Sequence, residues 1–492
     1  MSSLRRTKIV ATLGPATDDL ATLTEMVRTG VDVVRLNFSH GTQDDHRRRL
    51  ELVRAADAAT GKCVGVLADL GGPKIRIESF REGRVRLQEG ASFTLDTALD
   101  PRAGTVEAVG VAYKDLPRDV HPGDTLLLAD GQIVLDVQRV DGTRIESTVR
   151  VGGELSDRKG LNRQGGGISA PALSDKDRDD VRFAADNGID YVAVSFARSA
   201  DDINEAKILL RQWRGQARVV AKIERQEAVA NLASIIEATD AVMVARGDLG
   251  VEMGYAELTG LQKTIIHQTR NKSRAVITAT QMLESMVHRP QPTRAETSDV
   301  ANAILDGTDA LMLSAETAIG DYPIEAVKMM DRIARVVEAS EPSIFHSQTK
   351  AHAGTAQAVA RAASELAREL RVRAIVVITR TGRTAELLSK NRPSAPMVAF
   401  TEEEATARRL ALWWGIRCYA TTFLTDTDEM IAHIEGELLR FGLAAAGDAI
   451  ILVGSAPLIA HGRTNFLKVH RVREESPPAA RTRGTTRRRA QP

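Results

Sequence analysis

The chain has 492 residues, too many for a single hydrophobic core, so two to four domains are expected. Its hydrophobic content of 43% and charged content of 27% are those of an ordinary soluble globular protein, and no apolar run approaches membrane-spanning length. Aromatic residues make up only 4% of the chain, which argues against stacking platforms for single-stranded nucleic acid.

Apolar strand-like runs alternate with helical patterns such as Asp18–Thr29, Lys176–Asn187 and Gln226–Ala238. Nearly every predicted strand ends in polar residues, whereas a doubly wound open sheet would gather them at one switch point. The pattern therefore favours an α/β fold of the (β/α)8 TIM barrel type. Its eight strands are predicted at Lys8–Leu13, Val31–Leu36, Cys63–Ala68, Tyr191–Ser195, Val219–Ile223, Ala241–Ala245, Ala275–Ala279 and Ala310–Leu313.

The alternation of strands and helices stops after the third strand. Between about Pro73 and Pro171, short β-runs broken by Gly, Asp and Pro predict an all-β insertion. After Ser340, a helix at Gln357–Leu370 and four further strands predict a separate α/β domain. The predicted domains are a barrel at residues 1–72 and 172–341, an inserted β-domain at 73–171, and a C-terminal α/β domain at 342–472.

The net charge of +1 is unevenly distributed. Residues 471–492 contain seven arginines and two glutamates among many Pro, Ala and Thr residues, which predicts a disordered basic tail at 473–492. Such a tail could contact nucleic acid or a membrane surface, but a solvated extension is the simpler interpretation. Neither nucleic acid nor a membrane is therefore expected as a partner.

The N-terminus and the cysteines indicate a cytoplasmic protein. Met1–Thr7 has no apolar segment of the kind found in secretory signals. Cys63 and Cys418 lie far apart in apolar, strand-like runs, as expected for buried free thiols in a reducing compartment.

The stretch Val219–Gly250 carries the clearest chemistry. Lys222 and Glu224 end one predicted strand, and Gly247 and Asp248 follow the next, so all lie at one edge of a βαβ unit. Two carboxylates and a lysine on one rim suit a divalent metal ion and a charged oxygen substrate. A helix N-cap role would explain one of the acids, but not a lysine inside an apolar strand, where a bare ammonium is costly.

Long motifs from about Thr7 to Val472 resemble those of the pyruvate kinase family. The resemblance implies a barrel, an inserted β-domain that acts as a lid, and a C-terminal α/β regulatory domain. It also implies transfer of the phosphoryl group of phosphoenolpyruvate to ADP, giving pyruvate and ATP in the last step of glycolysis. The motifs are K-I-V-A-T-L-G-P-A (8–16), R-L-N-F-S-H-G (35–41), A-R-G-D-L-G-V-E (245–252), A-T-Q-M-L-E-S-M (279–286), P-T-R-A-E-T-S-D-V-A-N-A (292–303) and M-L-S-A-E-T-A-I-G-D-Y-P (312–323).

The resemblance assigns roles to residues on the predicted rim. Glu224 and Asp248 are expected to bind a catalytic Mg²⁺ or Mn²⁺, and Lys222 to bind substrate and stabilise the phosphoryl group in flight. Arg35 and Arg76 match arginines that grip phosphate, which a guanidinium fork suits. The contacts to the nucleotide phosphates are expected from Asn37, His40, Arg76 and Lys159.

The substrate carboxylate is expected to lie against the amides of Gly247 and Asp248, where a helix begins. Thr280 is expected to hydrogen-bond the substrate and to influence protonation of enolpyruvate. An ordinary helix N-cap would explain Thr280 equally well on sequence alone. Ser314 and Glu316 are weaker candidates for a proton relay through water.

The segment after the third strand departs from the pattern of many family members. Those members have a threonine after the Asp69 position and a glutamate at the position of Lys74, and they bind K⁺ there. Here Leu70 offers no side-chain oxygen, and Lys74 supplies a tethered charge that could replace the ion. Activity without K⁺ is therefore expected. The residues that resemble the K⁺-independent branch are Leu70, Gly71, Lys74 and Ile77, and the remnant of the ion site would comprise Asn37, Ser39 and Asp69.

Two other loops carry expectations. Asn162–Gly167 reads N-R-Q-G-G-G, whereas the family usually has Leu-Pro after the asparagine. More glycine and no proline predict a looser hinge between the lid and the barrel. The T-R-T-G-R-T loop resembles a cradle for an effector phosphate, and a sugar phosphate or AMP would suit it. A well-capped strand–turn–helix remains the alternative. The loop residues are Thr379, Arg380, Thr381, Gly382, Arg383 and Thr384.

Two competing functions are open at this point. Another metal-dependent barrel enzyme, such as an aldolase, would explain Glu224 and Asp248 but not the phosphate-gripping arginines. A catalytically inactive relative that binds RNA through its tail should have lost part of the site, yet Lys222 and Thr280 are present. The family resemblance also suggests a homotetramer.

Overall fold

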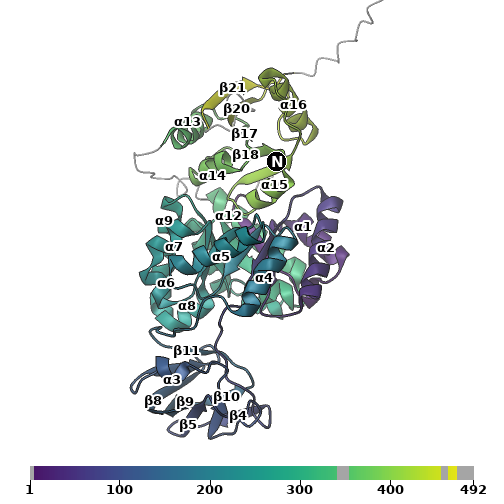
Figure 1. Cartoon of the computed structure of the whole chain (residues 1–492). Coiled ribbons are helices and arrows are strands. Elements are labelled where there is room, and N and C mark those ends of the chain that lie inside the picture. The colour runs from purple at the N-terminus through teal and green to yellow at the C-terminus, as the bar shows by residue number, and fades with distance from the viewer. Residues whose placement is uncertain (1–4, 341–353, 456–463, 474–492) are drawn as a thin grey trace, which may run out of the picture.

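The computed structural model describes residues 5–340, 354–455 and 464–473. Three bodies lie in a row, with the barrel between the inserted β-domain and the C-terminal α/β domain (Figure 1). The predicted basic tail, apart from Arg473, lies outside the described residues. None of the described helices is long and apolar enough to cross a lipid bilayer.

Eight parallel strands close the barrel in the order β1-β16-β15-β14-β13-β12-β3-β2, which confirms the predicted fold. Three strands have the predicted bounds, and the other five differ at one or both ends. The strands are β1 (Lys8–Thr12), β2 (Val33–Asn37), β3 (Gly65–Asp69), β12 (Tyr191–Val194), β13 (Arg218–Ile223), β14 (Ala241–Ala245), β15 (Ala275–Ala279) and β16 (Ala310–Leu313).

Helices cover the outside of the barrel. Several begin at capping boxes, for example at Ser174 and Thr293, where a hydroxyl accepts the N3 amide and the N3 acid accepts the N-cap amide. The helical elements are η1 (Pro15–Thr17), α1 (Leu20–Thr29), α2 (Gln43–Thr60), α4 (Asp175–Asp186), α5 (Ala200–Gln212), α6 (Gln226–Ala230), α7 (Leu232–Ala238), α8 (Arg246–Met253), α9 (Tyr255–Asn271), η2 (Glu284–Val287), α10 (Arg294–Leu305), α11 (Ala315–Ala318) and α12 (Pro323–Ser340).

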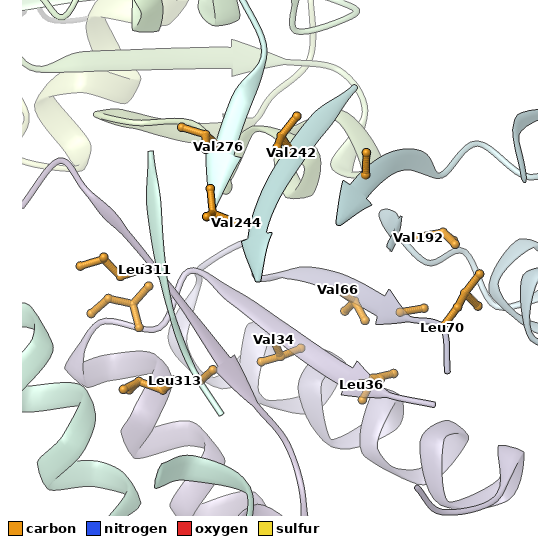
Figure 2. Close-up of a cluster of buried hydrophobic side chains, with 14 of the residues drawn as sticks. Val34, Leu36, Val66, Leu70, Val192, Val242, Val244, Val276, Leu311 and Leu313 are labelled. Carbon is orange, nitrogen blue, oxygen red and sulfur yellow. The ribbon is translucent and has the colours of Figure 1, made fainter. Parts of the chain in front are cut away.

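Side-chain alternation along the strands builds two apolar layers. Outward-facing residues such as Val34, Val192 and Val242 pack under the helices (Figure 2). Their inward-facing neighbours, including Val220 and Met243, fill the barrel interior. Lys222 lies on the inward side, one step above Val220, because strand residues two apart share a face.

The inserted domain consists mainly of a six-stranded sheet with its own apolar core. The prediction of an all-β insertion was wrong in one detail, because the turn before β7 contains a short helix, α3. Its elements are β4 (Arg84–Leu87), β5 (Ser92–Asp96), β6 (Ala108–Gly110), α3 (Leu116–Asp119), β7 (Thr125–Leu128), β8 (Ile133–Asp141), β9 (Arg144–Val151), β10 (Gly153–Ser156) and β11 (Leu161–Arg163).

The C-terminal domain has a five-stranded sheet in the order β19-β18-β17-β20-β21. The edge strand β21, antiparallel to β20, was not predicted, because its half-exposed polar residues give no apolar run. The elements are α13 (Thr355–Glu369), β17 (Ala374–Ile378), α14 (Arg383–Lys390), β18 (Met397–Thr401), α15 (Glu404–Leu410), β19 (Ile416–Ala420), α16 (Thr427–Arg440), β20 (Ala449–Gly454) and β21 (Phe466–Arg471).

The C-terminal domain closes the N-terminal mouth of the barrel. The apolar filling of the barrel continues without a break into this domain through Trp413 and Trp414. Beside it, Asp309 forms ion pairs with Lys390 (2.5 Å) and Arg392 (2.8 Å) in full burial. The opposite, C-terminal mouth is therefore the one left for chemistry.

Two smaller expectations are corrected. The helix predicted at Gln226–Ala238 is broken at Asn231 into α6 and α7. The cysteines are free, but Cys63 and Cys418 are half-buried rather than buried. Cys63 precedes β3, since that strand begins two residues later than predicted.

Candidate active site

The candidate site lies at the C-terminal ends of β2, β3, β12, β13 and β14, on the side where the chain leaves β3 for the inserted domain. The closed barrel brings together charged residues that are far apart in the chain, as parallel strands place their carboxyl ends on one rim.

Lys222 is the centre of the charge network. Its Nζ lies 2.9 Å from Glu224 Oε1, 3.1 Å from Asp69 Oδ1 and 2.6 Å from Ser195 Oγ. Burial acts to lower the pKa of Lys222, but the two carboxylates outweigh it and raise the pKa above its ordinary value. Lys222 is therefore a permanent ammonium, with one acceptor for each of its three protons.

Asp69 joins Lys222 to Arg35. Arg35 Nε donates to Asp69 Oδ2 at 2.6 Å, and its Nη1 donates to Thr12 Oγ1 at 3.1 Å. Although burial acts to raise the pKa of Asp69, the two cations on either side lower it overall. The carboxylate thus holds both cations in place, while the Arg35 side chain keeps 12% of its surface exposed.

Glu224 and Asp248 form the acidic part of the site. Glu224 Oε2 accepts the amide of Phe196 at 2.7 Å, and Asp248 Oδ1 lies 3.1 Å from Lys74 Nζ. Burial, together with the charge of Asp248, raises the pKa of Glu224 against the opposing effect of Lys222. A divalent cation between the carboxylates would relieve this repulsion, and hard oxygen donors suit Mg²⁺ or Mn²⁺.

The protein alone does not complete a metal site. Among the residues that the structure describes, no group of three or more His, Cys, Asp or Glu could hold a metal ion. Two carboxylates leave most coordination positions for substrate and water, which is typical of a catalytic rather than a structural metal ion.

Thr280 closes the rim next to Gly247. Its Oγ1 accepts the amide of Gly247 at 2.8 Å and donates to the carbonyl of Ala279 at 2.7 Å. Thr280 has φ of +68°, which is strained for a β-branched residue. No helix begins at Thr280, so the alternative role as a helix N-cap finds no support.

Glu316 supports the loop that carries Thr280. Its carboxylate accepts the amides of Leu283 (3.0 Å) and Ser314 (2.6 Å), and its burial raises its pKa. Arg246, the first residue of α8, supports the same loop from the other side. Its guanidinium donates to the carbonyl of Thr280 at 2.7 Å.

The residues predicted for the nucleotide come from two bodies. Asn37 is the last residue of β2, and His40 lies on the loop that follows it. Asn37 Oδ1 accepts the amide of Ser39 at 3.1 Å. Arg76 and Lys159 lie on two paired segments of the inserted domain, since Arg76 forms a β-bridge with Gly160. The structure therefore does not gather these four residues into one direct cluster.

Lys74 lies across the gap between the barrel and the inserted domain. Besides Asp248, its Nζ lies 3.9 Å from Asp130 of the inserted domain. No described contact joins Lys74 to Asn37, Ser39 or Asp69, which were predicted as the remnant of an ion site. The cations that contact Asp69 are instead Arg35 and Lys222.

The T-R-T-G-R-T loop joins β17 to α14. Gly382 has φ of +87°, and its amide donates to Thr379 Oγ1 at 3.1 Å, which shapes a tight turn. No side chain caps the first turn of α14. Arg218, the first residue of β13, contacts both Glu386 of α14 and the carbonyl of Thr381.

Sequence reasoning missed Ser195 and Phe196, which follow β12 and contact Lys222 and Glu224. The one signal for Ser195 was its position, because polar residues directly after a barrel strand belong to the rim. Phe196 acts through its backbone amide, which no side-chain pattern reveals.

Comparison with known proteins assigns the chain to one family over most of its length. Residues 4–327 match the family description "Pyruvate kinase, barrel domain", and residues 357–470 match "Pyruvate kinase, alpha/beta domain". Pyruvate kinase II of Salmonella typhimurium is 46% identical over 95% of this chain and 98% of its own length. The pyruvate kinase of Haemophilus influenzae is 49% identical over 91% and 95%. The crystal structure of a pyruvate kinase from Cryptosporidium parvum superimposes with a TM-score of 0.89 at 34% identity, covering 95% of this chain and 96% of that one.

Proposed function

The chain belongs to the pyruvate kinase family, whose members transfer a phosphoryl group from phosphoenolpyruvate to ADP. We propose that Lys222 stabilises this phosphoryl group during the transfer. The observation that supports this role most directly is the buried ammonium with three short contacts. A cation fixed in a dry site stabilises charge that develops on a transferring phosphoryl group. Released enolpyruvate then takes up a proton to give pyruvate.

Glu224 and Asp248 are proposed to hold Mg²⁺ or Mn²⁺. When bound, the ion would neutralise the phosphoenolpyruvate oxygens and orient them toward ADP. With the ion bound, Glu224 and Asp248 would no longer need to pair with Lys222 and Lys74. Both lysines are left to face the substrate.

Other residues bind and orient the reactants in this proposal. Arg35, held by Asp69, grips the phosphate of phosphoenolpyruvate through its exposed nitrogens. The amides of Gly247 and Asp248 hold the carboxylate of phosphoenolpyruvate. The amide of Gly247 becomes available once Thr280, which accepts it here, turns toward the substrate. Thr280 thereby contacts the enol, next to the loop braced by Glu316. The nucleotide phosphates lie between Asn37 and His40 on the barrel, and Arg76 and Lys159 on the inserted domain, which closes over them.

The test is a coupled assay for pyruvate with phosphoenolpyruvate, ADP and Mg²⁺. Glu224→Gln should reduce kcat by about 10³-fold and weaken Mn²⁺ binding, because one charged ligand is lost. The matched control is Glu237→Gln, an exposed glutamate paired with Lys272, which should leave both quantities unchanged. A wild-type protein without activity, with or without sugar phosphates or AMP, would refute the proposal.

We further propose that the enzyme needs no K⁺. The side chain of Asp69 is already neutralised by Lys222 and Arg35, and Lys74 adds a tethered positive charge beside the phosphate. In Na⁺- and K⁺-free buffer, the wild type should keep most of its activity. Lys74→Glu should become dependent on added K⁺, with Lys114→Glu in the inserted domain as control. Wild-type activity below a tenth of the K⁺-saturated value would contradict this proposal.

An effector phosphate is proposed to bind at Thr379–Thr384. The uncapped amides of α14 and the hydroxyls of the loop supply donors, and the Arg383 side chain is half exposed. AMP and ribose 5-phosphate are suitable probes. Wild-type kinetics indifferent to both, and to a panel of sugar phosphates, would refute it.

The remaining expectations stay proposals. The domain boundaries at residues 72–73, 171–172 and 341–342 and the homotetramer can be tested by limited proteolysis and light scattering. RNA binding through the tail can be tested by comparing RNA binding of the full chain with that of a variant that lacks residues 473–492.

A further inference from the structure

Ser195 is a buried hydroxyl directly after β12, with 1% of its surface exposed. Its Oγ lies 2.6 Å from Lys222 Nζ and 2.7 Å from the carbonyl oxygen of Leu70. A third neighbour, Asp69 Oδ1, is more distant at 3.4 Å. The hydroxyl therefore connects the lysine at the centre of the site to the end of β3.

The direction of these hydrogen bonds follows from the chemistry of the partners. An ammonium can only donate, and a carbonyl can only accept. Ser195 Oγ must therefore accept a hydrogen bond from Lys222 and donate one to the carbonyl oxygen of Leu70. Its single proton is committed to the backbone, so a lone pair remains directed at the ammonium.

The acceptors of Lys222 differ in what happens to them during catalysis. In the proposed function, on which this inference rests, Glu224 would hold the metal, and its place beside Lys222 would be open to a phosphoryl oxygen. Asp69 and Ser195 then remain as the two protein acceptors. With two of three N–H bonds fixed, the third has a defined direction. We propose that Ser195 is a positioning residue that aims the Lys222 ammonium at the transferring phosphoryl group.

The packing around Ser195 limits its movement. Gly72 has φ of +64°, and a Cβ added there would lie 2.8 Å from Ser195 Cβ. The amide of Gly72 is in turn held by Asp177 Oδ1 at 3.0 Å. Ser195 is therefore clamped between Lys222 and the segment that leaves the barrel for the inserted domain.

Two substitutions test the proposal. Ser195→Ala removes the acceptor, and Ser195→Cys fills nearly the same volume with a weak one. Both should lower kcat by about 10- to 100-fold, the range for a hydrogen bond to a charged group. The KM for phosphoenolpyruvate and the affinity for Mn²⁺ should change less than about threefold, because Arg35, Glu224 and Asp248 are untouched.

A partial reaction separates positioning from general damage. In the proposed function, exchange of the methyl protons of pyruvate with solvent depends on the metal and on Thr280, but involves no phosphoryl transfer. It should remain within about threefold of wild type in both variants. In a Lys222→Arg background, Ser195→Ala should cost much less than in the wild type, since the two residues act as a unit.

Wild-type kcat in Ser195→Ala would overturn the inference, as would parallel loss of proton exchange and kcat in Ser195→Cys. Both results leave the wild-type activity intact, so they differ from a failure of the proposed function, in which the wild type itself is inactive.

Discussion

The two mouths of the barrel both contain buried lysines, but the lysines have opposite environments. At the C-terminal mouth, two carboxylates raise the pKa of Lys222 despite its burial. At the N-terminal mouth, burial lowers the pKa of Lys390 to about 8, because its one carboxylate partner, Asp309, is shared with Arg392.

The difference separates a structural ion network from a functional one. Asp309 of the barrel is paired with Lys390 and Arg392 of the C-terminal domain, and all three side chains are almost fully buried. At the other mouth, the side chains of Arg35 and Asp248 retain 12% and 23% exposure and can exchange partners. Buried charges therefore serve to join domains at one mouth and to meet substrate at the other.

The largest expected effect breaks the functional network. Lys222→Met should reduce kcat by about 10³-fold, because the phosphoryl group loses its fixed cation. The fold should survive, since Arg35 still neutralises Asp69 and Glu224, with its raised pKa, can take up a proton. Steady-state kinetics and thermal unfolding measure the two quantities. Lys272→Met, at an exposed ion pair, is the control, and a Lys222→Met enzyme near wild-type activity would contradict the role.

The structural network should respond in the opposite way. Asp309→Asn leaves two buried cations without a carboxylate and should reduce the free energy of unfolding by about 3–5 kcal/mol. Below its lowered Tm, the variant should keep kcat within about twofold of wild type. The surface variant Asp44→Asn, which loses only an exposed pair with Arg47, should cost less than about 1 kcal/mol. Equal Tm values for the two variants would show that the Asp309 ion pairs do not stabilise the contact between the barrel and the C-terminal domain.

A smaller effect is expected where the two mouths communicate. Arg218 contacts the effector loop and α14 at one end of β13, and Lys222 lies four residues further along the same strand. Arg218→Met should raise the concentration of AMP or ribose 5-phosphate for half-maximal activation by about five- to tenfold, with little change in basal kcat. Arg211→Met on α5 serves as control. Unchanged activation would show that the loop signals by another route.

The smallest effect concerns a neutral residue beside the rim. His46 stacks on Phe38 and faces Lys176 of α4 as well as Asp45 and Arg49 of its own helix. Burial, followed by the charge of Arg49, lowers its pKa to about 4. Since the unfolded chain binds this proton at higher pH, stability should be complete above about pH 6.5 and decline toward pH 4.

At about pH 5.5 the loss attributable to His46 should be about 1 kcal/mol, because that pH lies about one unit below the pKa of histidine in the unfolded chain. His46→Gln should flatten this part of the stability curve in urea unfolding at several pH values. His121→Gln is the control, because the His121 side chain is exposed. A curve identical to that of wild type would contradict the prediction.

Sequence alone predicted much of the fold and named most residues of the rim. The strands Ala241–Ala245 and Ala275–Ala279 were placed to the residue, because a buried parallel strand is a continuous apolar run. Glu224 and Asp248 were recognised because their charge follows directly on such runs. The edge strand Phe466–Arg471 was missed because one half-exposed face leaves no such signal.

Only the tertiary structure determined which side chains contact one another across the ends of different strands. Ser195 and Asp69 are 27 and 153 residues from Lys222, and no spacing along the chain could reveal that both face its ammonium. Barrel closure sets these contacts, since the tilt and register of β3, β12 and β13 bring their ends to one point. Lys74 likewise pairs with Asp248 and not with Asp69, because the segment that contains Lys74 crosses the rim as it enters the inserted domain. The sequence by itself thus determined the kinds of groups at the site, and packing determined their partners.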